Sequence, residues 1–333
     1  MIRRSALILA WAWVLAALTI APAIRLAQHY LATPADVRAT GKVVRIPSGT
    51  GLRAAARILA REGVIDHPDL FALLTRLKGM GRELKFGEYR LSAALPPSQV
   101  LRVVTTGTPL QHRITFPEGL TVRKMAALLE RAGLADENRF LAKARDPALA
   151  AGLGLPGQDL EGYLFPDTYL LPRGLKPESI IRIMAGRFKE VFAQLKAAAP
   201  PANGLDDHQT VILASLVEAE TRVDQERPLV AGVFVRRLKK GMLLQCDPTV
   251  IYGFPELEGR LRKKHLTDPH PYNTYVHKGL PPGPIGNPGR AALAAALNPA
   301  QTKYLYFVSK NDGTHHFSRN YAQHRAAVNK YQR

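Results

Sequence analysis

Two segments of this 333-residue chain, about 70 residues apart, share one pattern, and this repeat constrains the fold more than any other feature. The positions identical at that offset are Pro47/Pro117, Gly49/Gly119, Arg53/Arg123, Ala56/Ala126, Leu59/Leu129, Arg61/Arg131 and Gly63/Gly133. A fixed offset of this kind marks a duplicated supersecondary unit. Each copy predicts a short strand, a turn, an amphipathic helix that ends at a glycine, and a second helix starting near Asp66 or Asp136.

The segment between the two copies adds a further strand and helix. Residues 84–91 alternate as a strand does, and residues 97–105 read as a helix. The resulting module, residues 43–110, resembles LysM-like glycan-binding domains. A duplicated structural module without a ligand explains the same pattern nearly as well, and the spacing does not decide between them.

The N-terminus predicts a membrane anchor. Arg3 and Arg4 precede an apolar run, residues 6–24, that carries no charge and has close to the roughly 20 residues a helix needs to cross a bilayer. By the positive-inside rule these arginines stay in the cytoplasm and the chain beyond Arg25 is extracytoplasmic. We therefore expect a single-pass anchor at 1–25 in the cytoplasmic (inner) membrane.

A short tether, residues 26–42, is expected between the anchor and the first folded module, because this stretch has no clear periodicity. The alternative to an anchor is a cleaved signal peptide, since residues 21–23 offer small side chains for cleavage. The apolar run is long for a signal peptide, which favours the anchor.

The charge and the cysteine content narrow the choice of partners. A net charge of +19 favours anionic partners, but export and the lack of a recognition motif argue against nucleic acid. Cys246 is the single cysteine, so no intrachain disulfide can form. The histidines show no zinc-ligand spacing, and we expect neither a metal nor a cofactor.

The larger domain, residues 111–333, begins with the second repeat copy at 111–150. Residues 177–198, 207–223 and 226–240 read as helices, and the stretch from Gly241 to Pro288 is mostly loop, which is typical of functional segments. Because residues 210–220 are apolar nearly all round, we expect a buried central helix. The predicted fold class is α+β.

That central helix ends with two glutamates, Glu218 and Glu220. At 100° per residue they point about 200° apart and cannot serve one site. Glu220 falls on an apolar face, where desolvation would keep it protonated as a general acid must be, and Asp224 could add to this effect. Glu218 has Arg222 four residues on as an expected ion-pair partner.

Several motifs make the chain similar to a known family over nearly its whole length. They are Glu161-Gly162 with Phe165-Pro166-Asp167-Thr168, the segment from Ala214 to Thr221, the segment from Leu244 to Gly253, Tyr272-Asn273-Thr274-Tyr275, the segment from Gly279 to Ile285, Asn287-Pro288-Gly289, and the segment from Tyr304 to Val308. With them the chain resembles the YceG-like endolytic murein transglycosylases. Cys246 departs from the pattern, since Ser or Thr is more often expected there.

The resemblance implies an activity and its essential residue. The family is a lyase class that cleaves the β-1,4 bond between N-acetylmuramic acid and N-acetylglucosamine in peptidoglycan, as the muramyl 6-hydroxyl attacks its own anomeric carbon. A 1,6-anhydro end results. The second glutamate of the family's Glu-x-Glu-Thr pattern is the essential one, which is Glu220 here.

Polar residues near that glutamate are candidates for holding the sugar. They are Gln245, Asp247, Thr249, Tyr252, Asn273, Thr274 and Tyr275, with Glu218 and Arg222 in support. Hydrogen bonds that only stabilise loops are an equally good explanation for any one of them.

Two further readings remain open. Cys246 beside a histidine could act as a nucleophile, although nothing in the spacing orients such a pair. The non-enzymatic alternative is a peptidoglycan-binding scaffold for cell-wall synthases such as penicillin-binding proteins. Such a scaffold would not need a protonated Glu220.

The anchor prediction can be checked by N-terminal sequencing of the mature membrane protein. We expect the chain to start at its encoded N-terminus, because a charge-free run of this length is retained as a membrane helix. A start near Ile24 would show that a signal peptide had been removed.

Overall fold

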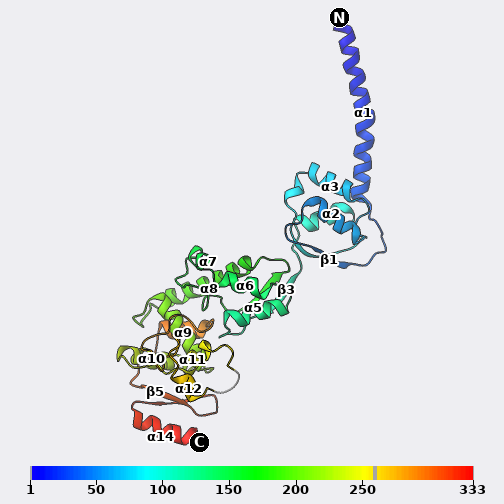
Figure 1. Cartoon of the computed structure of the whole chain (residues 1–333). Coiled ribbons are helices and arrows are strands. Elements are labelled where there is room, and N and C mark those ends of the chain that lie inside the picture. The colour runs from blue at the N-terminus through cyan, green and yellow to red at the C-terminus, as the bar shows by residue number, and fades with distance from the viewer. Residues whose placement is uncertain (1, 258–260, 333) are drawn as a thin grey trace. The chain divides into compact units, whose positions relative to one another are not determined.

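A computed structural model of the chain describes residues 2–257 and 261–332, with only the backbone described for residues 2–10 and 12–17 (Figure 1). It divides into two compact units. Unit 1 comprises residues 1–112 and 170–175, and unit 2 comprises residues 113–169 and 176–333. The sequence placed residues 170–175 in the larger domain, whereas the structure groups them with unit 1.

Unit 1 is built around the first repeat copy. Its elements are α1 (Ile2–Ala32), β1 (Lys42–Ile46), α2 (Leu52–Arg61), α3 (Pro68–Leu77), the 3-10 turn η1 (Met80–Arg82), β2 (Gly87–Leu91) and α4 (Pro97–Thr105). Strands β1 and β2 pair antiparallel, with Val44 opposite Tyr89. The inward side chains of the sheet and helices form one core that includes Ile46, Leu59 and Phe71.

Helix α1 continues to Ala32, so the first part of the expected tether at 26–42 is helical instead. Its last turns contact the module, because the hydroxyl of Tyr30 donates to the carbonyl oxygen of His67 at 3.2 Å and the two rings lie close. Where the structure describes the chain, no helix is both long and apolar enough to cross a membrane. Most side chains of the expected span, residues 6–24, lie outside the described ones, and the anchor stays a prediction.

Unit 2 contains the second copy and the helical domain that follows it. Its elements are α5 (Val122–Arg131), α6 (Glu137–Ala144), α7 (Pro147–Gly152), α8 (Pro177–Ala198), α9 (Asp207–Glu220), α10 (Arg227–Lys239), α11 (Asp247–Gly253), α12 (Lys263–Leu266), α13 (Arg290–Leu297), β5 (Tyr306–Ser309), β6 (His315–Ser318) and α14 (Tyr321–Tyr331). Strands β3 (Gln111–Thr115) and β4 (Thr168–Pro172) pair with each other, and the boundary between the units falls within both.

The predicted strand–helix–helix repeat is confirmed in both copies, as β1, α2 and α3 and then as β3, α5 and α6. The fold is α+β and mostly helical, with sheets of two strands among the described residues. The predicted helices at 97–105 and 177–198 match α4 and α8. Apolar periodicity located these elements well because each one buries a continuous face.

Helix α9 is the centre of unit 2, and it packs against α10, α11 and α13 (Figure 1). All residues from Thr210 to Val217 are buried, which confirms the expected central helix. A capping box starts the helix: the side chain of Asp206 accepts from the backbone of Gln209, whose side chain accepts in return. The helix stops at Glu220, three residues earlier than the sequence predicted, because Thr221 has an extended backbone.

A close approach between two loops fixes the surroundings of α9. Gly162 has a φ of +87°, and a Cβ there would lie 2.5 Å from Pro284 and 3.0 Å from Val211 of α9. Glycine is therefore required both by the backbone conformation and by the lack of space. The segment from Gly283 to Gly289 is buried here against the core.

We expect Gly162→Ala to destabilise the protein by about 2–4 kcal/mol, since it adds left-handed strain to a steric clash. Gly186→Ala is the matched control, because Gly186 is exposed within α8 with nothing within 4 Å of the added Cβ. That change should stabilise by about 0.5–1 kcal/mol. Thermal unfolding of both variants tests this, and an unaltered melting temperature for Gly162→Ala would contradict it.

Candidate active site

Glu220 is the last residue of α9, and its carboxyl group lies in a desolvated environment. Burial raises its pKa from the ordinary value of 4.5 to about 7. The thiol of Cys246 hydrogen-bonds to the carboxyl group and acts in the opposite direction, as does the positive charge of Arg237, while Asp247 adds to the rise. The direction of this rise is the one expected from the sequence, but Asp247, not Asp224, supplies the neighbouring negative charge.

Arg237 of α10 holds the backbone beside Glu220. Its guanidinium donates to the carbonyl oxygens of Leu243 and Leu244 at 3.2 and 2.8 Å and to that of Leu305 at 2.6 Å. Burial lowers the pKa of this group, and it lies over the ring of Tyr306. The sequence analysis missed Arg237, because a basic residue near the end of a helix looks like an ordinary solvated charge.

A tyrosine–aspartate pair lies at the start of α11, where Asp247 is the first residue. The hydroxyl of Tyr275 donates to Asp247 at 2.6 Å. Burial, Asp247 and the charge of Glu220 all raise the pKa of Tyr275, so the phenol remains a hydrogen-bond donor. Asp247 is exposed, which leaves this pair beside Glu220 open to a ligand.

Gln245 is also exposed, and its φ of +50° is left-handed. Its backbone nitrogen donates to the carbonyl oxygen of Thr274 at 3.1 Å, which holds the turn. Among the predicted sugar-binding residues, Gln245, Asp247 and Tyr275 therefore have side chains that solvent reaches.

Three other predicted sugar-binding residues are buried and already hydrogen-bonded. The hydroxyl of Thr249 donates to the carbonyl oxygen of Cys246, and the hydroxyls of Thr249 and Thr274 lie 2.9 Å apart. The amide of Asn273 donates to the carbonyl oxygens of His265, Leu266 and Asp268. Thr249 and Thr274 therefore stabilise the segment around Cys246, and Asn273 stabilises the loop of residues 265–268. This is the loop-stabilising role that the sequence left open.

Glu218 does form an ion pair, but the predicted partner Arg222 is wrong. Its carboxylate accepts from Arg227 at 2.8 Å, and both side chains are buried. It also accepts from the backbone nitrogen of Gly289 at 2.9 Å. Because α9 ends at Glu220 and the chain turns away, Arg222 is not one helical turn beyond Glu218 and is exposed.

Two more carboxylates lie near Arg227 and its ion pair with Glu218. Asp224 lies 2.9 Å from it and Glu118 lies 3.7 Å from it. Burial and the charge of Glu218 raise the pKa of Glu118. The cluster therefore connects the end of α9, the start of α10 and the loop before α5.

Glu161 is a second buried carboxyl group, quoted in a motif but given no role by the sequence analysis. It accepts from the backbone nitrogen of Val122, the amide of Asn287 and the hydroxyl of Tyr252. Burial raises its pKa to about 8. Tyr252, predicted to bind sugar, is half-buried and donates its hydroxyl to Glu161. The signal for Glu161 in the sequence was a glutamate within an otherwise apolar and Gly-rich segment.

The site combines a half-buried carboxyl group with a pKa near neutrality, a thiol, a fixed guanidinium, and a pair formed by half-buried Tyr275 and exposed Asp247. Such a carboxyl group can donate a proton to a leaving oxygen and afterwards accept one. In the part of the chain that the structure describes, no three His, Cys, Asp or Glu side chains are placed to hold a metal ion.

Comparison with known proteins finds relatives that match most of this chain. The model of the YceG-like family matches residues 44–330. The endolytic murein transglycosylase of Bacillus subtilis strain 168 is 32% identical over 305 residues, which cover 86% of this chain and 84% of that protein. A crystal structure of a yceG-like protein from Listeria monocytogenes is 28% identical with a TM-score of 0.58, over 87% of this chain and 99% of that one.

The endolytic murein transglycosylase of Streptococcus pneumoniae serotype 2 is 28% identical over 314 residues. The match covers 84% of this chain but only 56% of the streptococcal protein, which is therefore considerably longer than the shared part.

The raised pKa of Glu220 predicts how stability depends on pH. Between about pH 4.5 and 7 the folded protein keeps a proton that the unfolded chain releases, so stability falls as pH rises through this window. Glu220→Gln removes the effect and should be stabilised relative to the unaltered protein at pH 8, by about 1.4 kcal/mol for each unit of raised pKa.

Urea unfolding at pH 4.5 and at pH 8 measures this difference. Glu130→Gln, at an exposed position of α5, is the control and should change stability alike at both pH values. If Glu220→Gln changed the free energy of unfolding equally at both pH values, the raised pKa of Glu220 would be contradicted.

Proposed function

The chain belongs to the YceG-like family, and we propose that it is an endolytic lytic transglycosylase of peptidoglycan that leaves 1,6-anhydro ends. Its homologues named endolytic murein transglycosylase support lyase activity on peptidoglycan. The observation that carries the proposal is the position of Glu220, whose pKa of about 7 suits a group that must both give and take a proton.

In the proposed reaction, protonated Glu220 donates its proton to the glycosidic oxygen, and the bond from that oxygen to the anomeric carbon of N-acetylmuramic acid breaks. The resulting carboxylate then takes the proton from the muramyl 6-hydroxyl as this oxygen bonds to the anomeric carbon. The carboxyl group ends protonated again. One acid is enough, in contrast to hydrolases that need a second carboxylate for a nucleophile or a water molecule.

Groups around Glu220 would adjust its pKa and bind the sugar. The Cys246 thiol and Arg237 limit the rise in the pKa of Glu220, which keeps its carboxylate form accessible for the second proton transfer. Tyr275, Asp247 and Gln245 offer solvent-reachable donors and acceptors for sugar hydroxyls and acetamido groups. Thr249 and Thr274 would hold the segment around Cys246 in place, and Asn273 would hold the loop of residues 265–268.

We further propose that the protein is held in the cytoplasmic membrane by α1, with both units outside the cytoplasm. The charge-free run after Arg3 and Arg4 supports this, since it has the length of a membrane helix. From that position the enzyme would cut nascent strands near the cell-wall synthases, possible partners being penicillin-binding proteins, and so end strand elongation. The module at 43–110 would help to hold glycan.

The proposal predicts opposite behaviour for the two glutamates at the end of α9. Glu220→Gln should lower the yield of anhydro-muropeptides by at least about 10²–10⁴-fold while the protein stays folded, because an amide cannot transfer the proton. Glu218→Gln should instead cost about 2 kcal/mol of stability, because it weakens a buried bond to Arg227, and should leave most activity in the folded fraction.

Mass spectrometry of digests of purified glycan strands, with melting temperatures of both variants, provides the test. Reducing ends in place of anhydro ends would identify a hydrolase. Binding of strands without any cleavage by the unaltered protein would identify the scaffold alternative. A folded but inactive Glu218→Gln would overturn the assignment of roles.

A further inference from the structure

Four arginines surround one groove on unit 1. The groove has a volume of about 1010 Å³ and lies among α2, α3 and η1. Arg53 and Arg57 come from α2, Arg76 from α3 and Arg82 from η1. Of the lining residues that the structure describes, only Asp69 is negatively charged, so the groove is strongly cationic.

These arginines have no ion pair and no side-chain hydrogen bond within the described chain, and all four are exposed. Arg227 and Arg237 of unit 2, by contrast, are fully engaged with carboxylates or carbonyl oxygens. Like charges gathered without a counter-charge repel one another, and such a single-sign field favours an anion. The four guanidinium groups therefore point to an anionic ligand.

The second repeat copy shows that the fold itself does not require this charge. Arg123 corresponds to Arg53, but Ala127 stands where Arg57 stands in the first copy. Helix α5 nevertheless forms and packs as α2 does, with the same pattern of buried residues. The charge cluster is thus a property of the first copy, separate from what holds the module together.

Exposed leucines lie beside the cationic groove. Leu73 of α3 lines it with 53% of its surface exposed, and Leu77, one turn on, is 74% exposed. Helix α3 therefore presents large apolar side chains next to Arg76 on its outer surface. Apolar side chains beside basic ones are typical of surfaces that rest at the boundary between lipid head groups and acyl chains.

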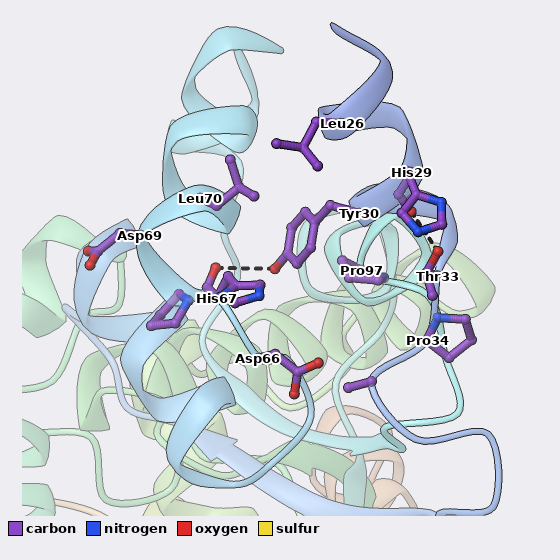
Figure 2. A pocket seen from close by; sticks show the side chains of 12 residues that line it. Leu26, His29, Tyr30, Thr33, Pro34, Asp66, His67, Asp69, Leu70 and Pro97 are labelled. Atoms are coloured by element: carbon purple, nitrogen blue, oxygen red, sulfur yellow. Dashed lines mark hydrogen bonds between the residues drawn. The ribbon is translucent and has the colours of Figure 1, made fainter. Parts of the chain in front are cut away.

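The same helix lies beside the end of α1. Figure 2 shows a second pocket, of about 530 Å³, in which Leu26 of α1 faces Leu70 of α3 and the Tyr30 hydroxyl reaches the carbonyl oxygen of His67. Tyr30 is six residues beyond Ile24, about 9 Å along a helix. That distance is comparable to the depth of the head-group layer outside the hydrocarbon core.

We propose that the groove of Arg53, Arg57, Arg76 and Arg82 binds the phosphodiester groups of anionic phospholipids at the membrane surface beside α1. Guanidinium groups pair with phosphate oxygens through two parallel hydrogen bonds, and Leu73 and Leu77 enter the apolar boundary below the head groups. The contact orients unit 1 against the membrane. This inference rests on the proposed anchoring by α1 and does not need the transglycosylase reaction.

The test measures binding of a soluble anionic lipid to the full chain in an uncharged detergent by titration calorimetry. The probe is dihexanoyl phosphatidylglycerol, and dihexanoyl phosphatidylcholine controls for uptake into micelles. Arg57→Gln/Arg76→Gln should weaken binding of the anionic lipid by about 30-fold at low salt, since each arginine near a lipid surface contributes about a factor of five.

Arg123→Gln/Arg139→Gln is the matched control, because it removes the same charge from exposed positions on α5 and α6 of the second copy. It should leave the affinity unaltered, and equal melting temperatures should show that both double variants are folded. Equal affinity for the two lipids, or an equal loss in both variants, would overturn the proposal.

A third titration uses sodium pyrophosphate to distinguish binding of a phospholipid from binding of a free phosphate compound. We expect it to bind more weakly than the anionic lipid, because it offers nothing to the exposed leucines. Tighter binding of pyrophosphate would overturn the lipid assignment. Because none of these measurements reads glycan cleavage or anchoring, failure here is distinguishable from failure of the proposed function.

Discussion

The site in unit 2 depends on a helix that is buried along most of its length and stops abruptly. Helix α9 is surrounded by α10, α11 and α13, and its backbone turns to an extended conformation at Thr221. The stop delivers Glu218 and Glu220 to two different environments less than one helical turn apart. One carboxylate meets a guanidinium and the other meets a thiol within an apolar setting.

These two environments give the two carboxyl groups different partners. Glu218 has the guanidinium of Arg227 and a backbone amide as partners, and through them it joins α9 to α10 and to the loop before α13. Glu220 has only a weak donor, and desolvation dominates its pKa. Keeping an acid protonated near neutral pH lowers stability at higher pH.

The arginines discussed above differ between the two units in burial and in their partners. In unit 2, Arg227 and Arg237 are buried and use their planar donors to hold carboxylates or carbonyl oxygens in place. In unit 1, the arginines around the groove are exposed and have no anionic partner among the residues that the structure describes. The net charge alone is thus a poor guide to function. Arginines that are paired within the protein must first be distinguished from those that are exposed and can bind a ligand.

The sequence by itself determined the repeat, the helices with one continuous apolar face, and the placement of Glu218 and Glu220 on different sides of the central helix. Each depends on periodicity or on local spacing, which short-range geometry fixes. Its prediction of Arg222 as the partner of Glu218 failed because that required the helix to continue, and tertiary contacts ended it instead.

Only the tertiary structure decided which polar side chains of the loops face inward. The hydroxyls of Thr249 and Thr274 bond to each other, and Asn273 donates to backbone carbonyl oxygens, whereas Gln245 and Asp247 reach solvent. Loop residues carry no periodicity from which direction could be read. Their burial follows from contacts between segments far apart in the chain, as when Arg237 holds Leu305 and Leu244 together, and these contacts exist only in the folded molecule.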